Sequence, residues 1–300
     1  MAVQHPFPES NYQCGNVRKS LVTDDCACID GELAESIPVG RRGQRKGLLY
    51  DQAYPDFDPV LWPHVVPAPG SGEGLYRVEL EGGGVLLVVH ERGVDSHLVG
   101  IGESWLDQHF SCRDGDGAHG SMVGVGQHLR RDGRMGDYVL SGGEGGRPQI
   151  KADMERAGRE FGRVFRGRGV GFEQMLERQG ELWRQSGRPG AWHYPQHWDA
   201  SGDLGNAEHV DADGWRSYAV WFARHGHMSQ SKRWWLLFPR HGVAVQLAHG
   251  CWVSWDGSIA PHCTCVPKVA EGDRLMSVFC STSPRMRSVC SRGESGVVRT

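Results

Sequence analysis

The residues with the clearest chemical content are two histidines and one aspartate. His209-Val-Asp211 forms a His-x-Asp motif, and His262 follows far downstream. Two imidazoles and one carboxylate can bind one face of Fe(II) and leave the other positions open for O₂ and a co-substrate. Residues 209 and 211 share a face of an extended strand, so both side chains can reach one ion. We therefore expect His209, Asp211 and His262 to be metal ligands and the catalytic centre.

Further side chains near these ligands could bind small molecules. Arg274 lies downstream of the last ligand, where its guanidinium could hold a co-substrate carboxylate by a bidentate contact. The alternative is that Arg274 pairs with a structural carboxylate in its own turn. Asp213 could hydrogen-bond a substrate or cap the turn in which it lies. The residues that we expect to line the substrate pocket are Asp213, Trp215, Ser217 and Trp255.

A β-scaffold must bring these distant ligands together, and the pattern after residue 207 predicts one. Short apolar runs alternate with turn signals such as Arg240-His241-Gly242 and Asp256-Gly257. The predicted strands are 217–222, 234–238, 243–247, 251–255, the stretch at His262, and 275–279. Short strands at this spacing are typical of a sandwich or a barrel-like roll.

The segment before these strands is predicted to be helical. One face of a first helix carries apolar residues at helical spacing: Met154, Ala157, Phe161, Val164 and Phe165. A second helix is predicted over 172–185. Earlier still, 74–80 and 85–89 alternate like the strands of a hairpin.

Other stretches are rich in turn-forming residues. We expect the Gly-rich segment 112–149 to form mobile surface loops, and 188–206 to be a connection rich in Pro, Gly and Trp. Prolines predict an irregular N-terminal wrap over 1–73. The polar segment 283–300 reads as a flexible tail.

Composition limits the class of protein. With a net charge of −3, the molecule as a whole does not attract polyanions. Any nucleic-acid contact therefore needs a local basic patch. No apolar run is long enough to span a membrane, and the N-terminus lacks the apolar core of a signal peptide. Nine cysteines, an odd count, favour free thiols in a reducing intracellular compartment. Eleven tryptophans suit a core and also base stacking.

Residues 205–282 resemble the double-stranded β-helix core of Fe(II)/2-oxoglutarate dioxygenases. The likeness lies in NAEHVDADGWRSYAVWF, HGCWVSWDG and PHCTCVPKVAEGDRLMSVFC. Within that superfamily the pattern is most similar to the TET and base-J-binding-protein branch, especially its algal and fungal members. The similar features are the His-x-Asp motif, the following strand with Ser and Trp, and the Trp-Asp-Gly turn before the distal histidine.

The resemblance implies a fold and an activity. The fold is α+β and mainly β: a double-stranded β-helix core (205–282) buttressed by helices (150–187) within one dioxygenase domain (74–282). The activity is oxidation of the methyl group of 5-methylcytosine in nuclear DNA, with the base flipped out of the duplex. Fe(II) would sit on His209, Asp211 and His262, and Arg274 would anchor 2-oxoglutarate. Some algal members of the branch use ascorbate instead, and that alternative stays open.

Two other functions fit the same residues. A prolyl-hydroxylase-like enzyme with a protein substrate would share the three ligands, and a non-catalytic binding module could share the roll. Other ligand sets are also open. Cys-x-Cys pairs at Cys26 and Cys263 could hold zinc, and alternative distal histidines are His225, His227, His241 and His249. His193 and His197 could wall the substrate pocket or be ordinary surface residues.

A basic stripe is the last candidate. Arg156, Arg159, Arg163 and Arg166 repeat at helical spacing. An exposed stripe of this kind could contact DNA phosphates, or it could simply be a solvated helix face.

Overall fold

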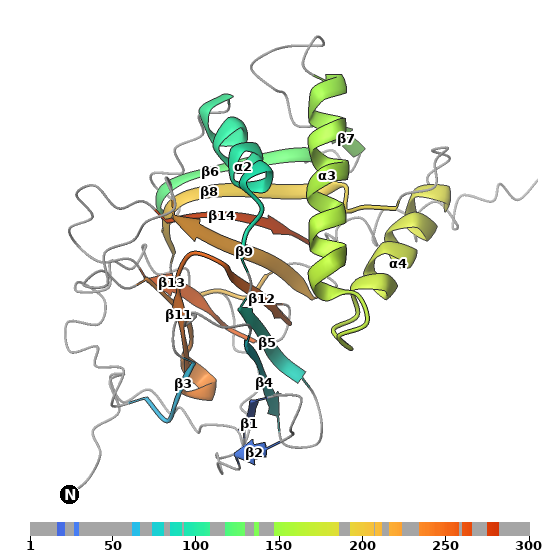
Figure 1. The fold of residues 1–300 in the computed structure, drawn as a ribbon. Helices are drawn as coiled ribbons and strands as arrows, with labels where there is room; N and C mark the ends of the chain where they lie inside the picture. The colour runs from blue at the N-terminus through green and yellow to red at the C-terminus, as the bar shows by residue number, and fades with distance from the viewer. Residues whose placement is uncertain are drawn as a thin grey trace, which may run out of the picture.

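The strands that the structure describes form two sheets, and helices lie on one side of them (Figure 1). The computed structural model describes, in whole or in part, residues 62–66, 74–80, 85–91, 93–108, 118–129, 135–137, 147–185, 193–206, 208–211, 216–223, 234–257, 260–265 and 275–281, and the backbone of 17–21 and 27–29.

Within these residues the large sheet has ten strands, in the order β2-β1-β4-β5-β12-β9-β14-β8-β6-β7. Their bounds are β1 (Val17–Leu21), β2 (Ala27–Ile29), β4 (Gly74–Leu80), β5 (Val85–Glu91), β6 (Ala118–Leu129), β7 (Met135–Asp137), β8 (His197–Asn206), β9 (Ser217–Ala223), β12 (Cys251–Trp255) and β14 (Leu275–Cys280). All neighbours in this sheet are antiparallel.

The small sheet of the described chain has four strands, in the order β13-β10-β11-β3. Their bounds are β3 (His64–Val66), β10 (Trp234–Phe238), β11 (Val243–Leu247) and β13 (Cys263–Cys265). A short 3₁₀ turn, η4 (Pro239–His241), joins β10 to β11. Only β3 and β11 pair in parallel within this sheet.

The two sheets pack face to face around an apolar core. Alternate residues of a strand point to opposite faces, so in β9 Ala219 and Trp221 face the small sheet, whereas Tyr218 and Val220 face the helices. The inner core joins Trp221 and its neighbours to residues of β10 and β11 such as Leu236. These alternating strands make the large sheet the middle of three layers.

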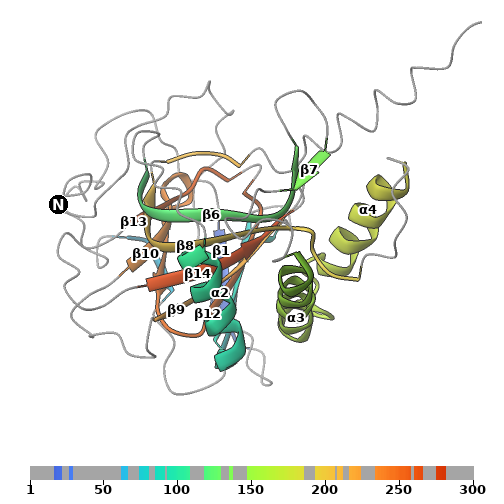
Figure 2. The same ribbon diagram turned by 90° about the horizontal axis from the view of Figure 1, so that it is seen from above.

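Three helices, α2 (Ser96–Gln108), α3 (Arg147–Phe165) and α4 (Phe172–Gln185), belong to the outer layer. Figure 2 shows α2 and α3 on one face of the large sheet. Phe161 of α3 lies edge-on to Trp198 of β8 and Trp252 of β12, with ring centroids 5.0 Å and 5.2 Å away. The amphipathic face predicted from the sequence is therefore the face that packs on the sheet.

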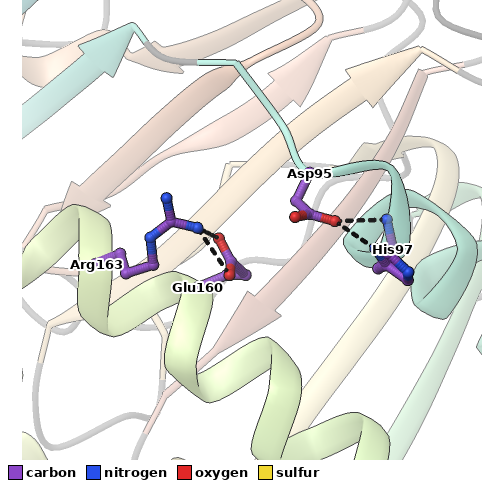
Figure 3. A network of polar contacts seen from close by, with 4 residues as sticks. All are labelled: Asp95, His97, Glu160 and Arg163. Atoms are coloured by element: carbon purple, nitrogen blue, oxygen red, sulfur yellow. Dashed lines mark hydrogen bonds and ion pairs between the residues drawn. The ribbon is translucent and has the colours of Figure 1, made fainter.

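The start of α2 is capped by Asp95. Its carboxylate accepts a hydrogen bond from the backbone N–H of His97 at 2.7 Å, as an N-cap does (Figure 3). That hydrogen bond lowers the pKa of Asp95, and the charge of Arg163 adds to the effect. Arg163 itself pairs with Glu160 at 2.8 Å on the neighbouring α3.

The fold class predicted from the sequence, α+β and mainly β, is confirmed. The predicted strands 217–222, 234–238, 243–247 and 251–255 correspond to β9, β10, β11 and β12. The predicted strands at His262 and at 275–279 correspond to β13 and β14, and the hairpin corresponds to β4 and β5. The two predicted helices are α3 and α4. Of the described helices, none is long and apolar enough to cross a membrane.

Several expectations were wrong. The Gly-rich segment 112–149 contains β6 and β7, and the segment 188–206 ends in β8. Glycine is needed in β6 because a Cβ on Gly126 would overlap the backbone carbonyl of Gln196, directly before the neighbouring strand β8. Helix α2 was not predicted. The stretch 1–73, expected to be irregular, includes β1 and the edge strand β2 of the large sheet, and the edge strand β3 of the small sheet.

Replacing Phe161 with Ala should lower the free energy of unfolding by about 3–5 kcal/mol, because its ring is fully buried between two tryptophans. Urea unfolding followed by circular dichroism measures the change. Lys151→Ala, on an exposed position of the same helix, should stay within about 0.5 kcal/mol. Equal losses in the two variants would contradict this packing.

The stability of the fold should also fall in alkali. Burial raises the pKa of the Cys280 thiol well above its ordinary value of 9.0. The folded chain therefore keeps this proton where the unfolded chain loses it. The stabilisation is complete below pH ~9 and declines above that, by up to about 1.4 kcal/mol per pH unit for one thiol. Urea midpoints between pH 8 and pH 10.5 should fall less steeply in Cys280→Ala than in the wild type.

Candidate metal centre

His209 and His262 face each other across an isolated antiparallel bridge. The backbone N–H of each donates to the carbonyl of the other, both at 2.9 Å. Residues opposed in this way carry their side chains on the same side. Their rings consequently lie together, with centroids 4.5 Å apart. A local backbone pairing thus joins two candidate ligands that are far apart in the sequence.

Asp211 is held in place by a second backbone contact. Its N–H donates to the carbonyl of Gly257 at 2.8 Å. The Asp-Gly turn also leaves room for the Asp211 carboxylate, because a Cβ on residue 257 would overlap Oδ2. Ser217 Oγ donates to the same oxygen at 3.3 Å. The carboxylate is therefore oriented by Ser217 at the start of β9 and by Gly257 just after the end of β12.

The three ligand atoms are close enough to share one ion. Asp211 Oδ1 lies 3.3 Å from His209 Nε2, and Asp211 Oδ2 lies 3.5 Å from His262 Nε2. One ligand atom from each of the three residues can be chosen so that all lie within 4.8 Å of one another. Ligands about 2.1 Å from an ion and at right angles lie about 3 Å apart. The set fits a divalent ion after a small inward movement.

His262 presents a lone pair to this point. Its Nδ1 lies 2.9 Å from the carbonyl of Ala260, which can only accept a hydrogen bond, so Nδ1 carries the proton. The neutral ring then has its lone pair on Nε2, the tautomer in which a histidine binds metal through that atom. Only 4% of the His262 side chain is exposed, against 33% for His209. The ion would approach from the side of His209.

The charges of the site suit metal binding. Burial raises the pKa of Asp211, but the attraction of His262, the hydrogen bond from His209 and the donor Ser217 outweigh it, so the net pKa is lowered. Burial lowers the pKa of His262 to about 4. At neutral pH the site therefore holds a carboxylate anion and a neutral imidazole, the forms that coordinate a cation.

Aromatic side chains of the inner core surround the buried ligand. The rings of Phe238 and Trp255 lie 5.9 Å and 5.5 Å from the His262 ring. Residues of both sheets enclose a cavity of about 30 Å³, room for about one water. It is lined by Ser201, Leu204, Trp221, Trp234, Thr264, Leu275 and Ser277. The interior near the site is thus mostly apolar, with a few hydroxyl groups.

Two residues that support the site were not singled out from the sequence. The sequence marked Gly257 only as part of the Trp-Asp-Gly turn that precedes His262. It did not show that the Asp211 carboxylate packs against this glycine. Asn206 accepts a hydrogen bond from the N–H of Thr264 at 2.6 Å through Oδ1. It ties the end of β8 to β13, the two strands next to His209 and His262. No sequence pattern marks this contact.

The predicted site residues divide into two groups. His209, Asp211 and His262 come together, with Ser217 and Trp255 beside them. Ser217 contacts the carboxylate of Asp211, and Trp255 contacts His262. The other predicted residues, Arg274, Asp213 and Trp215, lie outside the described residues.

The alternative ligands lie elsewhere. His249 accepts from the N–H of Ala223 at 3.3 Å, and His197 Nδ1 lies 2.9 Å from the carbonyl of Gln127. His193 is exposed, and burial lowers the pKa of His241 to about 4. Within the described residues the one group of three or more potential ligands is His209, Asp211 and His262. Cys263 and Cys265 are buried free thiols, and Cys26, His225 and His227 lie outside the described residues.

The predicted basic stripe is exposed along α3. Arg159 pairs with Glu155 at 2.9 Å, and Arg163 pairs with Glu160. Helix α3 covers the face of the large sheet opposite to the core around His262. A phosphate bound there, with Arg156 and Arg166, would lie across the sheet from the metal ligands.

Comparisons with known proteins give structural likenesses but no sequence match. No family model matches the chain, and no curated protein matches its sequence. Among solved structures, NgTET1 in complex with 5mC DNA is similar at 10% sequence identity and a TM-score of 0.45. The match covers 69% of this chain and 76% of that protein. A likeness at this level concerns the course of the backbone alone.

Replacing Gly257 with Ala should weaken metal binding about 10- to 100-fold, because the new methyl group displaces the Asp211 carboxylate. Isothermal titration with Mn(II) measures the affinity. Gly100→Ala is the matched control, since a Cβ there meets nothing within 4 Å. If both glycine variants bind Mn(II) like the wild type, Asp211 is not a ligand.

Proposed function

We propose that this protein is a non-haem Fe(II) dioxygenase that oxidises the methyl group of 5-methylcytosine in DNA. The observation that carries the proposal is the cluster of His209, Asp211 and His262, two partly buried residues and one buried histidine, which brings two imidazoles and one carboxylate together. That ligand set leaves metal positions open. We further propose that the two facing sheets are a double-stranded β-helix core.

Each residue of the site has a defined task in this proposal. His209, Asp211 and His262 hold the ion, which when bound supplies O₂ activation and the oxidation of a C–H bond. The backbone bridge and Gly257 fix the positions of the ligands. Ser217 keeps one oxygen of Asp211 hydrogen-bonded. Phe238 and Trp255 keep bulk water away from the buried side of the centre.

The co-substrate is 2-oxoglutarate or ascorbate. Arg274 is the proposed anchor for the distal carboxylate of 2-oxoglutarate, because a guanidinium binds a carboxylate by two parallel hydrogen bonds. Ascorbate has no such second carboxylate and would depend less on this residue. The dependence of turnover on Arg274 therefore separates the two co-substrates.

The proposed substrate follows from the motif likeness of residues 205–282. A methylated base must leave the duplex to reach a buried ion. Asp213 and Trp215 stand beside the ligand Asp211 in the sequence, and they are the proposed contacts to the flipped base. Action on nuclear DNA implies a nuclear location.

The activity is tested by supplying Fe(II) with each co-substrate and three substrates: methylated duplex DNA, unmethylated duplex DNA and a proline-rich peptide. We expect consumption of one co-substrate to depend on the methylated duplex. Mass spectrometry of the digested DNA should show loss of 5-methylcytosine. His209→Ala should reduce this turnover at least 100-fold, because the ion loses one of three ligands.

His193→Ala is the control for that variant, since His193 is an exposed histidine outside the cluster. It should keep wild-type turnover. Turnover with the peptide and not with DNA would show that the substrate is a protein and would contradict the proposed DNA substrate. A wild-type protein that binds no divalent ion would refute the dioxygenase proposal as a whole.

A further inference from the structure

The indole N–H of Trp255 is hydrogen-bonded to His262 Nε2, the atom through which His262 would bind a metal ion. Trp255 Nε1 donates to His262 Nε2 at 3.2 Å. Because Nδ1 of His262 carries the ring proton toward Ala260, the lone pair on Nε2 is the acceptor. A neutral imidazole has one such lone pair. The indole and the ion therefore compete for it.

Trp255 cannot turn to water when it loses this partner. Its side chain is fixed on the inner face of β12, between Trp221 and Phe279, with ring centroids 6.1 Å and 5.8 Å away. Only 4% of the residue is exposed. The displaced N–H would remain inside the protein, beside the ion, and a buried donor without an acceptor is unfavourable.

We propose that Trp255 is a specificity-determining donor that selects an anionic oxygen ligand beside the metal. Once the ion takes the His262 lone pair, the indole N–H donates to a carboxylate or enediolate oxygen of the co-substrate. A coordinated water is a poor substitute, because the ion uses one of its two lone pairs and polarises its O–H bonds, so it mainly donates. A carboxylate oxygen keeps free lone pairs.

The inference rests on the metal centre of the proposed function and adds a coupling to it. Binding of the ion alone breaks the indole hydrogen bond without replacing it. Binding of the ion with an oxyanion restores a partner for the N–H. The ion and the oxyanion should consequently strengthen each other's binding, and the coupling is reciprocal.

Trp255→Phe tests this coupling, because it keeps an aromatic ring and removes the N–H. Mn(II) affinity is measured from the free-ion signal in electron paramagnetic resonance, without and with oxalate as the oxyanion probe. The variant should bind Mn(II) alone about five- to tenfold more tightly than the wild type, since no hydrogen bond must be broken. Oxalate should raise the Mn(II) affinity of the variant about five- to tenfold less than that of the wild type.

Trp252→Phe is the matched control. Trp252 lies on the same strand, is equally buried, and faces the helices on the other side of the sheet. This variant should show the wild-type affinity and the wild-type effect of oxalate. Equal values in the wild type and Trp255→Phe, with and without oxalate, would overturn the proposal while leaving the metal centre intact.

A second measurement uses the wild-type protein alone and so does not depend on the folding of a variant. With ¹⁵N-labelled tryptophan, one indole N–H signal should move when Zn(II) is added, and move again in the opposite sense when oxalate follows. Zn(II) binding with no indole signal shifted would also overturn the donor role. Failure of the wild type to bind Zn(II) or Mn(II) would instead contradict the proposed function itself.

Discussion

The whole site depends on one pair of backbone hydrogen bonds, those between His209 and His262. In an antiparallel hydrogen-bonded pair the two Cα atoms lie about 5.5 Å apart. That spacing places both side chains close enough to reach one ion after a small inward movement. Asp211 is then two residues from His209 and needs only the contact with Gly257 to join them.

This pairing lies where the two sheets meet. His209 follows β8 of the large sheet, and His262 directly precedes β13 of the small sheet. Asn206 adds a side-chain contact between the same two stretches, two residues beyond His262 at Thr264. The same contacts therefore fix both the relative position of the two sheets and the distance between His209 and His262. A change that lets the sheets slide would also pull the ligands apart.

The sequence pointed to the cluster of His209, Asp211 and His262 and to most strands because those signals are local. Apolar runs such as Trp234–Phe238 between turn residues need no knowledge of the partner strand. β6 and β8 were not predicted because they contain glycines and polar residues, which are typical of loops. Gly126 belongs in a strand only because the backbone of Gln196 packs closely against it, and that contact joins distant segments. The register that sets Gly257 beside Asp211 joins distant segments, and no pattern along the chain contains it.

The charge balance of the centre favours an anionic oxygen ligand, the same class that the indole N–H of Trp255 favours. Asp211 brings one negative charge, and His262 is neutral because burial lowers its pKa to about 4. A histidine coordinates an ion through an unprotonated nitrogen, so a divalent ion on His209, Asp211 and His262 would leave one uncompensated positive charge beside an apolar core. Such a charge is unfavourable away from water unless an anion pairs with it. An anionic oxygen ligand removes the excess charge and accepts the hydrogen bond of the displaced indole. Electrostatics and hydrogen bonding therefore favour the same chemical class of co-substrate, although they arise from different residues.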